Sequence, residues 1–173
     1  DVEGVFNLGG DLNLFLQYIT SRDRKGLIDY AINSIDLVYR NFIHLNADLT
    51  TITLVQGDAL GGGFESAISA NVVIAERGVK MGLPEALFNL FPGMGAYSLL
   101  SRKIGSGAAE KMILSGKLFR SEELFDLGIV DVLAEKGGGE IAVYNYMKTA
   151  NRSSNTYSMM RKVRDICNQV DYK

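Results

Sequence analysis

The sequence predicts an α/β fold, in which short apolar strands alternate with amphipathic helices along a single domain. Residues 52–55 and 72–75 are apolar runs too short for a buried helix, and the second is rich in β-branched residues. Between residues 26 and 45, apolar residues recur every three or four positions, which is typical of a long helix with one buried face. A chain of 173 residues is the right size for one such domain.

Turn and capping signals predict the remaining elements. Gly9 and Gly10 allow the chain to turn sharply after a short strand over residues 4–8, and Asp11 can cap the helix that follows. Ser121 is expected to cap a later helix in the same way. The other predicted strands cover residues 79–82 and 128–133, and the other predicted helices cover residues 12–19, 64–70, 96–104, 108–114, 141–148 and 157–170.

The composition excludes several classes of protein. Hydrophobic residues make up 47% of the chain and charged residues 22%, which is ordinary for a globular domain. The net charge of −2 provides no general basic surface for nucleic acid. No apolar run reaches the roughly 18 residues needed to span a membrane. Cys167 is the only cysteine and cannot form a disulfide within the chain, which suits a cytoplasmic protein. No metal ion or other cofactor is expected.

A glycine-rich turn is the strongest local signal, and it reads V-Q-G-D-A-L-G-G-G-F-E over residues 55–65. Gly61, Gly62 and Gly63 lie between a predicted strand and a predicted helix, where backbone N–H groups favour negative charge. The stretch lacks the Lys-Ser/Thr of a phosphate loop and the G-x-G-x-x-G of a dinucleotide site, and Glu65 would repel phosphate. A thioester carbonyl that becomes an enolate fits better. From the glycines alone, a tight turn without chemistry is an equally good interpretation.

A second carboxylate, Glu85, follows Glu65 after about one predicted helix and one predicted strand. Pro84 stiffens the approach to Glu85, and a further glycine turn, F-P-G-M-G, follows over residues 91–95. An isolated Pro-Glu is more often the exposed first turn of a helix. The spacing from Glu65 and the flanking glycines favour a paired role for the two glutamates.

Taken together, these motifs resemble the crotonase (enoyl-CoA hydratase/isomerase) superfamily. The resemblance rests on F-N-L-G-G-D-L over residues 6–12, G-D-A-L-G-G-G-F-E over residues 57–65 and G-L-P-E followed by F-P-G-M-G. The longer stretch G-L-P-E-A-L-F-N-L-F-P-G-M-G-A-Y-S is most similar to bacterial diffusible signal factor synthases, which make cis-2-unsaturated fatty acid signals. The resemblance covers residues 5 to 135.

The resemblance implies a crotonase-like ββα spiral that here lacks the family's N-terminal strands and part of its C-terminal helical region. On this basis residues 1–136 are expected to form a partial core and residues 137–173 the start of the helical region. The family also implies a homo-trimer or hexamer. The charge run over residues 21–25 is expected to be a solvated face, and a weak contact with the acyl carrier is the alternative.

The resemblance also implies the site residues. Glu65 and Glu85 would be the catalytic acid and base, and the N–H groups of Leu8 and Gly62 would form the oxyanion hole. The residues expected to contact substrate are Gly9, Gly10, Gly61, Gly63, Leu83, Gly93 and Met94. His44, the sole histidine, is not expected to be catalytic.

The function implied is dehydration of a 3-hydroxyacyl thioester, carried by acyl carrier protein, to a cis-2-enoyl product. Hydrolysis of the thioester would then release a fatty acid signal. The first alternative is an enoyl-CoA hydratase or isomerase that acts on coenzyme A esters. The second alternative is a fragment or assembly module without catalytic activity.

Overall fold

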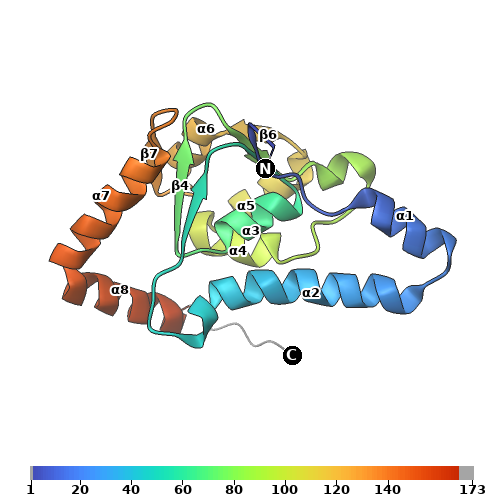
Figure 1. Ribbon diagram of the computed structural model, residues 1–173, viewed down its shortest axis with the longest axis horizontal. Helices are drawn as coiled ribbons and strands as arrows, with labels where there is room; N and C mark the ends of the chain where they lie inside the picture. The colour runs from blue at the N-terminus through green and yellow to red at the C-terminus, as the bar shows by residue number, and fades with distance from the viewer. Residues whose placement is uncertain (1, 168–173) are drawn as a thin grey trace.

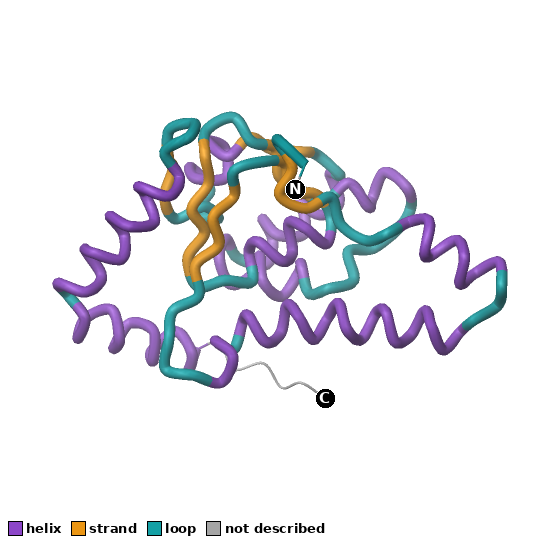
Figure 2. Tube along the Cα trace, viewed as in Figure 1, coloured by secondary structure: helices purple, strands orange, loops and turns teal. Residues whose placement is uncertain are grey.

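The structure, a computed structural model, describes residues 2–167 and consists of two sheets flanked by helices (Figures 1 and 2). In chain order the elements are β1 (Val5–Asn7), α1 (Leu12–Thr20), α2 (Arg24–Phe42), the 3₁₀ helix η1 (His44–Asn46), β2 (Ile52–Val55), β3 (Asp58–Leu60), α3 (Gly62–Ile68), β4 (Val72–Glu76), β5 (Lys80–Gly82), the 3₁₀ helix η2 (Pro84–Phe88), α4 (Ala96–Ile104), α5 (Ser106–Ser115), β6 (Leu118–Arg120), α6 (Ser121–Asp126), β7 (Val132–Ala134), α7 (Gly139–Arg152) and α8 (Ser154–Cys167).

The strands form two separate sheets. The first has the order β1-β3-β5-β6, in which β1, β3 and β5 run parallel and β6 pairs antiparallel with β5. The second has the order β2-β4-β7 and is wholly parallel. The chain passes from the second sheet to the first between β2 and β3. The glycine turn at residues 61–63 therefore directly follows β3, a strand of the first sheet.

The core lies between the sheets and the central helices. Every residue of β4 is buried, as expected for a parallel strand covered on both faces. Val73 and Ala75 belong to the main core, which also contains Phe64 of α3. Val72 and Ile74 face the other way, into a smaller cluster that includes residues of α7. The α/β fold predicted from the sequence is confirmed.

The helices are arranged around this core in distinct places (Figure 1). Helix α2 runs along the lower side of the view and contacts α3, whereas α7 packs on β2 and β4. Helices α7 and α8 form a bent pair at the end of the molecule opposite α1. Within the described part of the chain, none of the helices is long and apolar enough to cross a membrane.

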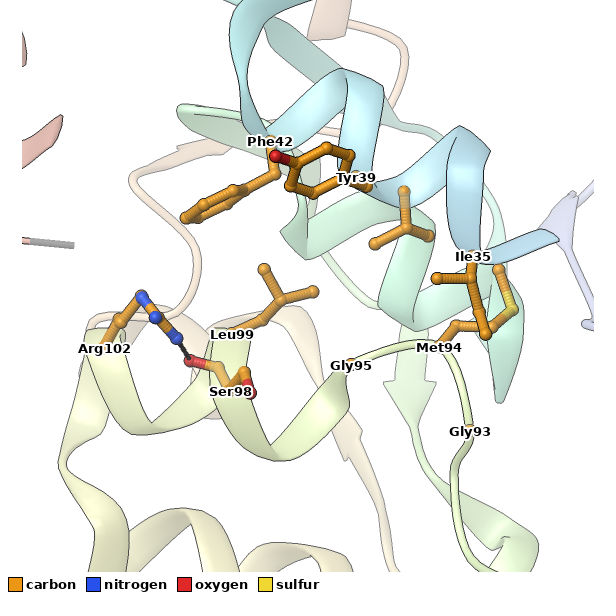
Figure 3. A pocket seen from close by; sticks show the side chains of 10 residues that line it. Ile35, Tyr39, Phe42, Gly93, Met94, Gly95, Ser98, Leu99 and Arg102 are labelled. Carbon is orange, nitrogen blue, oxygen red and sulfur yellow. Dashed lines mark hydrogen bonds between the residues drawn. The ribbon is translucent and has the colours of Figure 1, made fainter. Parts of the chain in front are cut away.

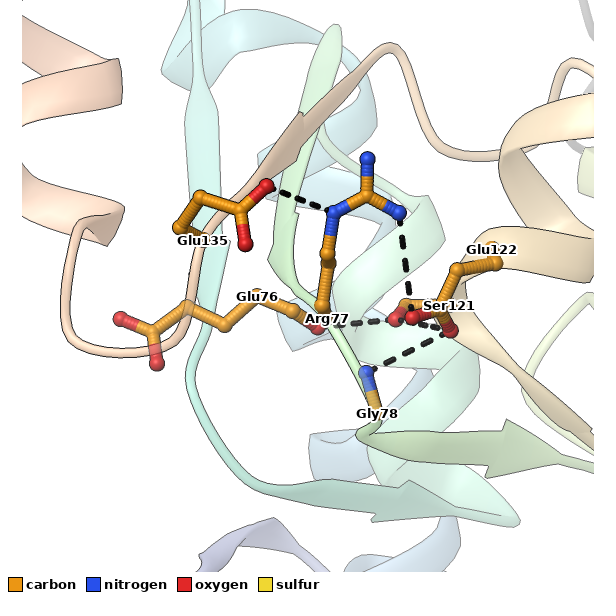
Figure 4. Close-up of polar contacts among 6 residues, drawn as sticks. All are labelled: Glu76, Arg77, Gly78, Ser121, Glu122 and Glu135. Atoms are coloured by element: carbon orange, nitrogen blue, oxygen red, sulfur yellow. Dashed lines mark hydrogen bonds and ion pairs between the residues drawn. The ribbon is translucent and has the colours of Figure 1, made fainter.

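A polar network fixes the end of β4 against α6 and β7 (Figure 4). The Ser121 hydroxyl donates to the carbonyl oxygen of Glu76 at 2.8 Å, and the next residue, Arg77, pairs with Glu135 at 2.8 Å. The prediction that Ser121 caps a helix is therefore wrong. Ser121 is the first helical residue, is fully buried, and uses its hydroxyl to bind β4 instead.

Other departures from the sequence prediction concern short strands. Strands β3 and β6 were not predicted, and β7 starts at Val132 rather than at residue 128. Asp11 does cap α1, since its carboxylate accepts from the N–H groups of Asn13 and Leu14. The end of the helix predicted over residues 157–170 lies outside the described residues.

Candidate active site

Glu65 lies in the first turn of α3, a helix that follows a glycine with positive φ. Gly61 has φ +55°, in the region that favours glycine, and its N–H donates to the carbonyl oxygen of Gly82 in β5 at 2.9 Å. The helix begins at Gly62, so the first N–H groups have no partner within the helix itself. Only 1% of Glu65 is exposed.

One oxygen of the Glu65 carboxyl is held by the chain that enters α4. Oε1 accepts from the backbone N–H groups of Met94 and Ala96, each at 2.9 Å. These donors belong to the glycine turn over residues 91–95 and the residue after it. In residues 2–163 no group donates to Oε2. The carboxyl is thus fixed in orientation through one oxygen, and its second oxygen has no donor.

Burial changes the acidity of Glu65. Loss of solvent raises the pKa of this carboxyl, the amides of Ala96 and Met94 oppose the rise, and the charge of Glu85 adds to it. The resulting pKa is about 7. Near neutral pH, Glu65 therefore exists in both protonation states, which suits a residue that exchanges a proton during turnover.

Glu85 approaches the same turn from η2. A methyl group at Gly61 would lie 2.7 Å from Oε1 of Glu85, so this carboxyl rests directly against the glycine backbone. Its Oε2 is buried and has no hydrogen-bond partner among the described residues. Burial raises the pKa of Glu85 as well. Both glutamates therefore lie beside the start of α3, although they come from separate elements.

A cavity of about 410 Å³ opens beside Glu85, and Glu65 is not among the residues that line it. Seven of the predicted site residues line it, namely Leu8, Gly9, Gly10, Gly61, Glu85, Gly93 and Met94. Its remaining walls are mainly apolar and come from α1, α2 and η2. The structure therefore brings the first glycine loop, the central glycine turn and Glu85 to one concave surface.

The other four predicted residues, Glu65 among them, do not line this cavity. Gly62 adjoins it, because a methyl group there would be 2.8 Å from Sδ of Met94 and 3.7 Å from Cα of Gly9. Gly63 instead packs on β1, where an added methyl group would lie 2.0 Å from the carbonyl oxygen of Asn7. Leu83 is 1% exposed and belongs to the core. Gly63 and Leu83 thus support the site and do not line the cavity.

Sequence reasoning missed several residues around the site. Tyr30 and Phe15 line the cavity and stack edge to face, with ring centroids 4.8 Å apart. A second cavity of about 270 Å³ lies between α2 and α4 and shares Ile35, Gly93 and Met94 with the first (Figure 3). Phe15, Tyr30 and Ile35 belong to ordinary amphipathic helices, and no motif distinguishes them from core positions.

Comparison with known proteins identifies the family. The sequence model of the enoyl-CoA hydratase/isomerase family matches residues 2–166. Residues of the chain are 33% identical over 134 positions to the peroxisomal fatty acid beta-oxidation multifunctional protein AIM1 of Arabidopsis thaliana, covering 78% of this chain and 18% of that protein. They are 34% identical over 111 positions to the peroxisomal bifunctional enzyme of Danio rerio, covering 63% and 16%. The chain therefore spans less than a fifth of these two relatives.

Solved structures agree with this result. DspI of Pseudomonas aeruginosa superposes with a TM-score of 0.79 and 26% identity, covering 95% of this chain and 65% of that one. The enoyl-CoA hydratase of Thermoplasma volcanium shares the fold with a TM-score of 0.76 at 23% identity, covering 95% and 63%. The fold is thus crotonase-like. By the match of the family model over nearly its whole length, the chain belongs to the enoyl-CoA hydratase/isomerase family.

Proposed function

We propose that this site dehydrates a 3-hydroxyacyl thioester to a cis-2-enoyl thioester, with Glu85 as the base and Glu65 as the acid. The observation that carries the proposal is the placement of two carboxyls with raised pKa values beside the glycine-rich start of α3. A hydrophobic cavity at this point can hold the acyl chain.

In the first step, the Glu85 carboxylate removes the proton from the α carbon. The electron pair of that C–H bond moves towards the carbonyl, and negative charge develops on the thioester oxygen. The N–H groups of Leu8 and Gly62 are the proposed donors to this oxygen, since Leu8 lines the cavity and Gly62 begins α3 beside it. A single donor of this kind typically contributes about 3 kcal/mol to lowering the barrier.

In the second step, the enolate collapses and the bond between the β carbon and its hydroxyl oxygen breaks. Protonated Glu65 gives its proton to the departing oxygen, which leaves as water. A carboxyl with a pKa of about 7 is both protonated often enough to donate and acidic enough to release its proton.

Release of the product would need a further step. Water adds to the thioester carbonyl, the C–S bond breaks, and the carrier thiol leaves with a proton, which yields a free cis-2-unsaturated fatty acid. Acyl carrier protein is the proposed carrier. The support for hydrolysis and for this carrier is the similarity of residues 57–65 and 82–98 to diffusible signal factor synthases.

The second candidate function is hydration or isomerisation of enoyl-CoA esters. It is favoured by the family match and by the relative from Arabidopsis thaliana that is named for fatty acid beta-oxidation. The same pair of carboxyls serves either direction, because hydration reverses the dehydration steps. The carrier and the hydrolytic step therefore separate the two functions.

The discriminating experiment presents the full-length parent protein with 3-hydroxyacyl carrier protein and, separately, with crotonyl-CoA. Release of unsaturated free acid from the first substrate supports the proposal. Rapid hydration of crotonyl-CoA with no acid released supports the second candidate. Turnover that is unchanged in both Glu65→Gln and Glu85→Gln would contradict both and favour a structural role.

Two broader proposals concern the whole protein. Self-association into a trimer or a hexamer is proposed, with residues 137–173 as the start of the helical region that forms the contacts. A cytoplasmic location remains a prediction from the single cysteine.

A further inference from the structure

The second cavity continues the first beyond Met94. Ile35, Gly93 and Met94 line both cavities, and Figure 3 shows these three residues at one side of the second cavity. The backbone N–H of Met94 is also a donor to Glu65. An acyl chain that passes the two glutamates can therefore extend past this residue, between α2 and α4.

The walls of the second cavity are apolar, but one of its lining residues is a cation. Val38, Phe42 and Leu99 contribute apolar surface, and Arg102 lines the cavity from the far end of α4 (Figure 3). The guanidinium lies 5.5 Å from the centre of the Phe42 ring, and its Nη1 donates to the carbonyl oxygen of Ser98. A charged group of this kind is unusual at the end of an apolar cavity.

The charge of Arg102 is not compensated within the described chain. Its Nε is buried and has no hydrogen-bond partner there, and no carboxylate in residues 2–163 forms an ion pair with it. The carboxylate of Asp131, which lines a neighbouring polar cavity together with Arg102, binds Lys103 and the N–H of Val73 through Oδ2 and forms no ion pair with Arg102. A guanidinium that lines an apolar cavity without a carboxylate partner favours a ligand that supplies one.

We propose that the second cavity takes the distal end of the acyl chain and that Arg102 binds a terminal carboxylate on it. The substrate class is then an ω-carboxyacyl thioester rather than a purely alkyl one. The assignment rests on the proposed function, since it places the thioester beside Glu65 and Glu85. A terminal methyl group would leave the Arg102 guanidinium without a counter-charge, whereas a carboxylate accepts from it in a charge-assisted hydrogen bond.

The test uses matched acyl-CoA esters in a series of increasing length, each with an alkyl and an ω-carboxy form. Dissociation constants are measured by calorimetry with the full-length parent protein, its Arg102→Met variant and a Lys103→Met control. At the length that fits, the parent is expected to bind the ω-carboxy form about tenfold more tightly. Arg102→Met is expected to lose this preference, and Lys103→Met, which alters a residue outside the second cavity, is expected to keep it.

The outcomes separate this inference from the proposed function. Equal or weaker binding of the ω-carboxy form at every length overturns the inference even if Arg102→Met fails to fold, because that comparison uses the parent alone. Turnover of alkyl thioesters without a carboxylate preference leaves the proposed function standing and removes the inference. A preference in binding that depends on Arg102, without turnover of any ester, supports the assignment of the ligand and contradicts the proposed chemistry.

Discussion

Glu65 combines burial with a fixed orientation. Its carboxyl is removed from water, yet the amides of Met94 and Ala96 hold one oxygen in place. The opposing effects leave the pKa at about 7 instead of the usual 4.5 of a glutamate side chain. Glu85, which is less buried, has its pKa raised by the same loss of solvent. Two carboxyls with raised pKa values beside one glycine turn can act as acid and base in one reaction.

The proposed roles predict a pH dependence. Dehydration needs Glu65 protonated and Glu85 ionised, so kcat/KM for a 3-hydroxyacyl thioester is expected to fall as the pH rises above about 7. Glu65→Gln is expected to lower kcat by roughly 10²–10⁴-fold and to remove this alkaline limb. The measurement is a pH–rate profile of both proteins. A parent profile that stays flat through the alkaline range would contradict the role of Glu65 as the acid.

The same pKa predicts a change in stability. Because the folded-state pKa of Glu65 is raised, its contribution to stability is fully present below pH 4.5 and is lost as the pH rises through about 7. At alkaline pH, Glu65→Gln is therefore expected to be more stable than the parent by about 3 kcal/mol, with no difference in acid. Urea unfolding at several pH values measures this. An equal stability difference at all pH values would show that Glu65 does not change its ionisation on folding.

The roles of single residues could be predicted only in part. Glu65 and Glu85 lie in motifs that are recognisable in the sequence, and the structure places both beside Gly61. The amides that bind Glu65 come from a segment about thirty residues further on, and only tertiary packing brings them there. Nothing in the spacing of α4 indicated that Arg102 lines a cavity.

At the scale of elements, the site depends on how closely α3 approaches the first sheet. Gly63 touches the backbone of Asn7 in β1, and this contact sets the glycine loop at residues 8–10 beside the start of α3. The strands that hold this loop are only three residues long. Such short segments show no periodicity, and β3 and β6 were not predicted although β1 and β5, of the same length, were, whereas the long α2 and the buried β4 were predicted from their patterns.

This close approach predicts a large effect from one methyl group. Gly63→Ala places a carbon 2.0 Å from the carbonyl oxygen of Asn7, so a backbone must move, and the expected loss of stability is about 3 kcal/mol. Gly107→Ala is the control, because this helical glycine has open space around it and alanine favours a helix. Thermal unfolding of both variants gives the comparison. A Gly63→Ala protein as stable as Gly107→Ala would show that α3 and β1 are not in contact.

At the scale of the whole molecule, the two sheets lie beside different parts of the structure. The first sheet and η2 surround the glutamates, and the second sheet carries α7 on its outer face. Helix α7 leaves Ile141, Tyr144 and Met147 exposed, at 67%, 65% and 50%. Apolar residues gathered on one helix face are typical of a surface that is covered in the assembled protein.

The proposed self-association predicts that this face of α7 is a contact between copies. Replacing Tyr144 by Glu is expected to shift the full-length protein to a smaller species in sedimentation velocity, because a charge in an apolar contact is unfavourable. Gln17→Glu, at an exposed polar position in α1 at the opposite end of the molecule, is the control and is expected to keep the assembly. An unchanged sedimentation coefficient for the Tyr144 variant would place the contact elsewhere.

The central claim is that a carboxylate beside the glycine turn removes a proton from the α carbon of a thioester. Exchange of that proton with deuterated water, followed by NMR on a saturated acyl thioester that cannot eliminate, measures this step alone. The account predicts exchange catalysed by the parent protein and lost in Glu85→Gln, with Glu65→Gln retaining it. The absence of exchange in the parent, or equal exchange in Glu85→Gln, would contradict the account.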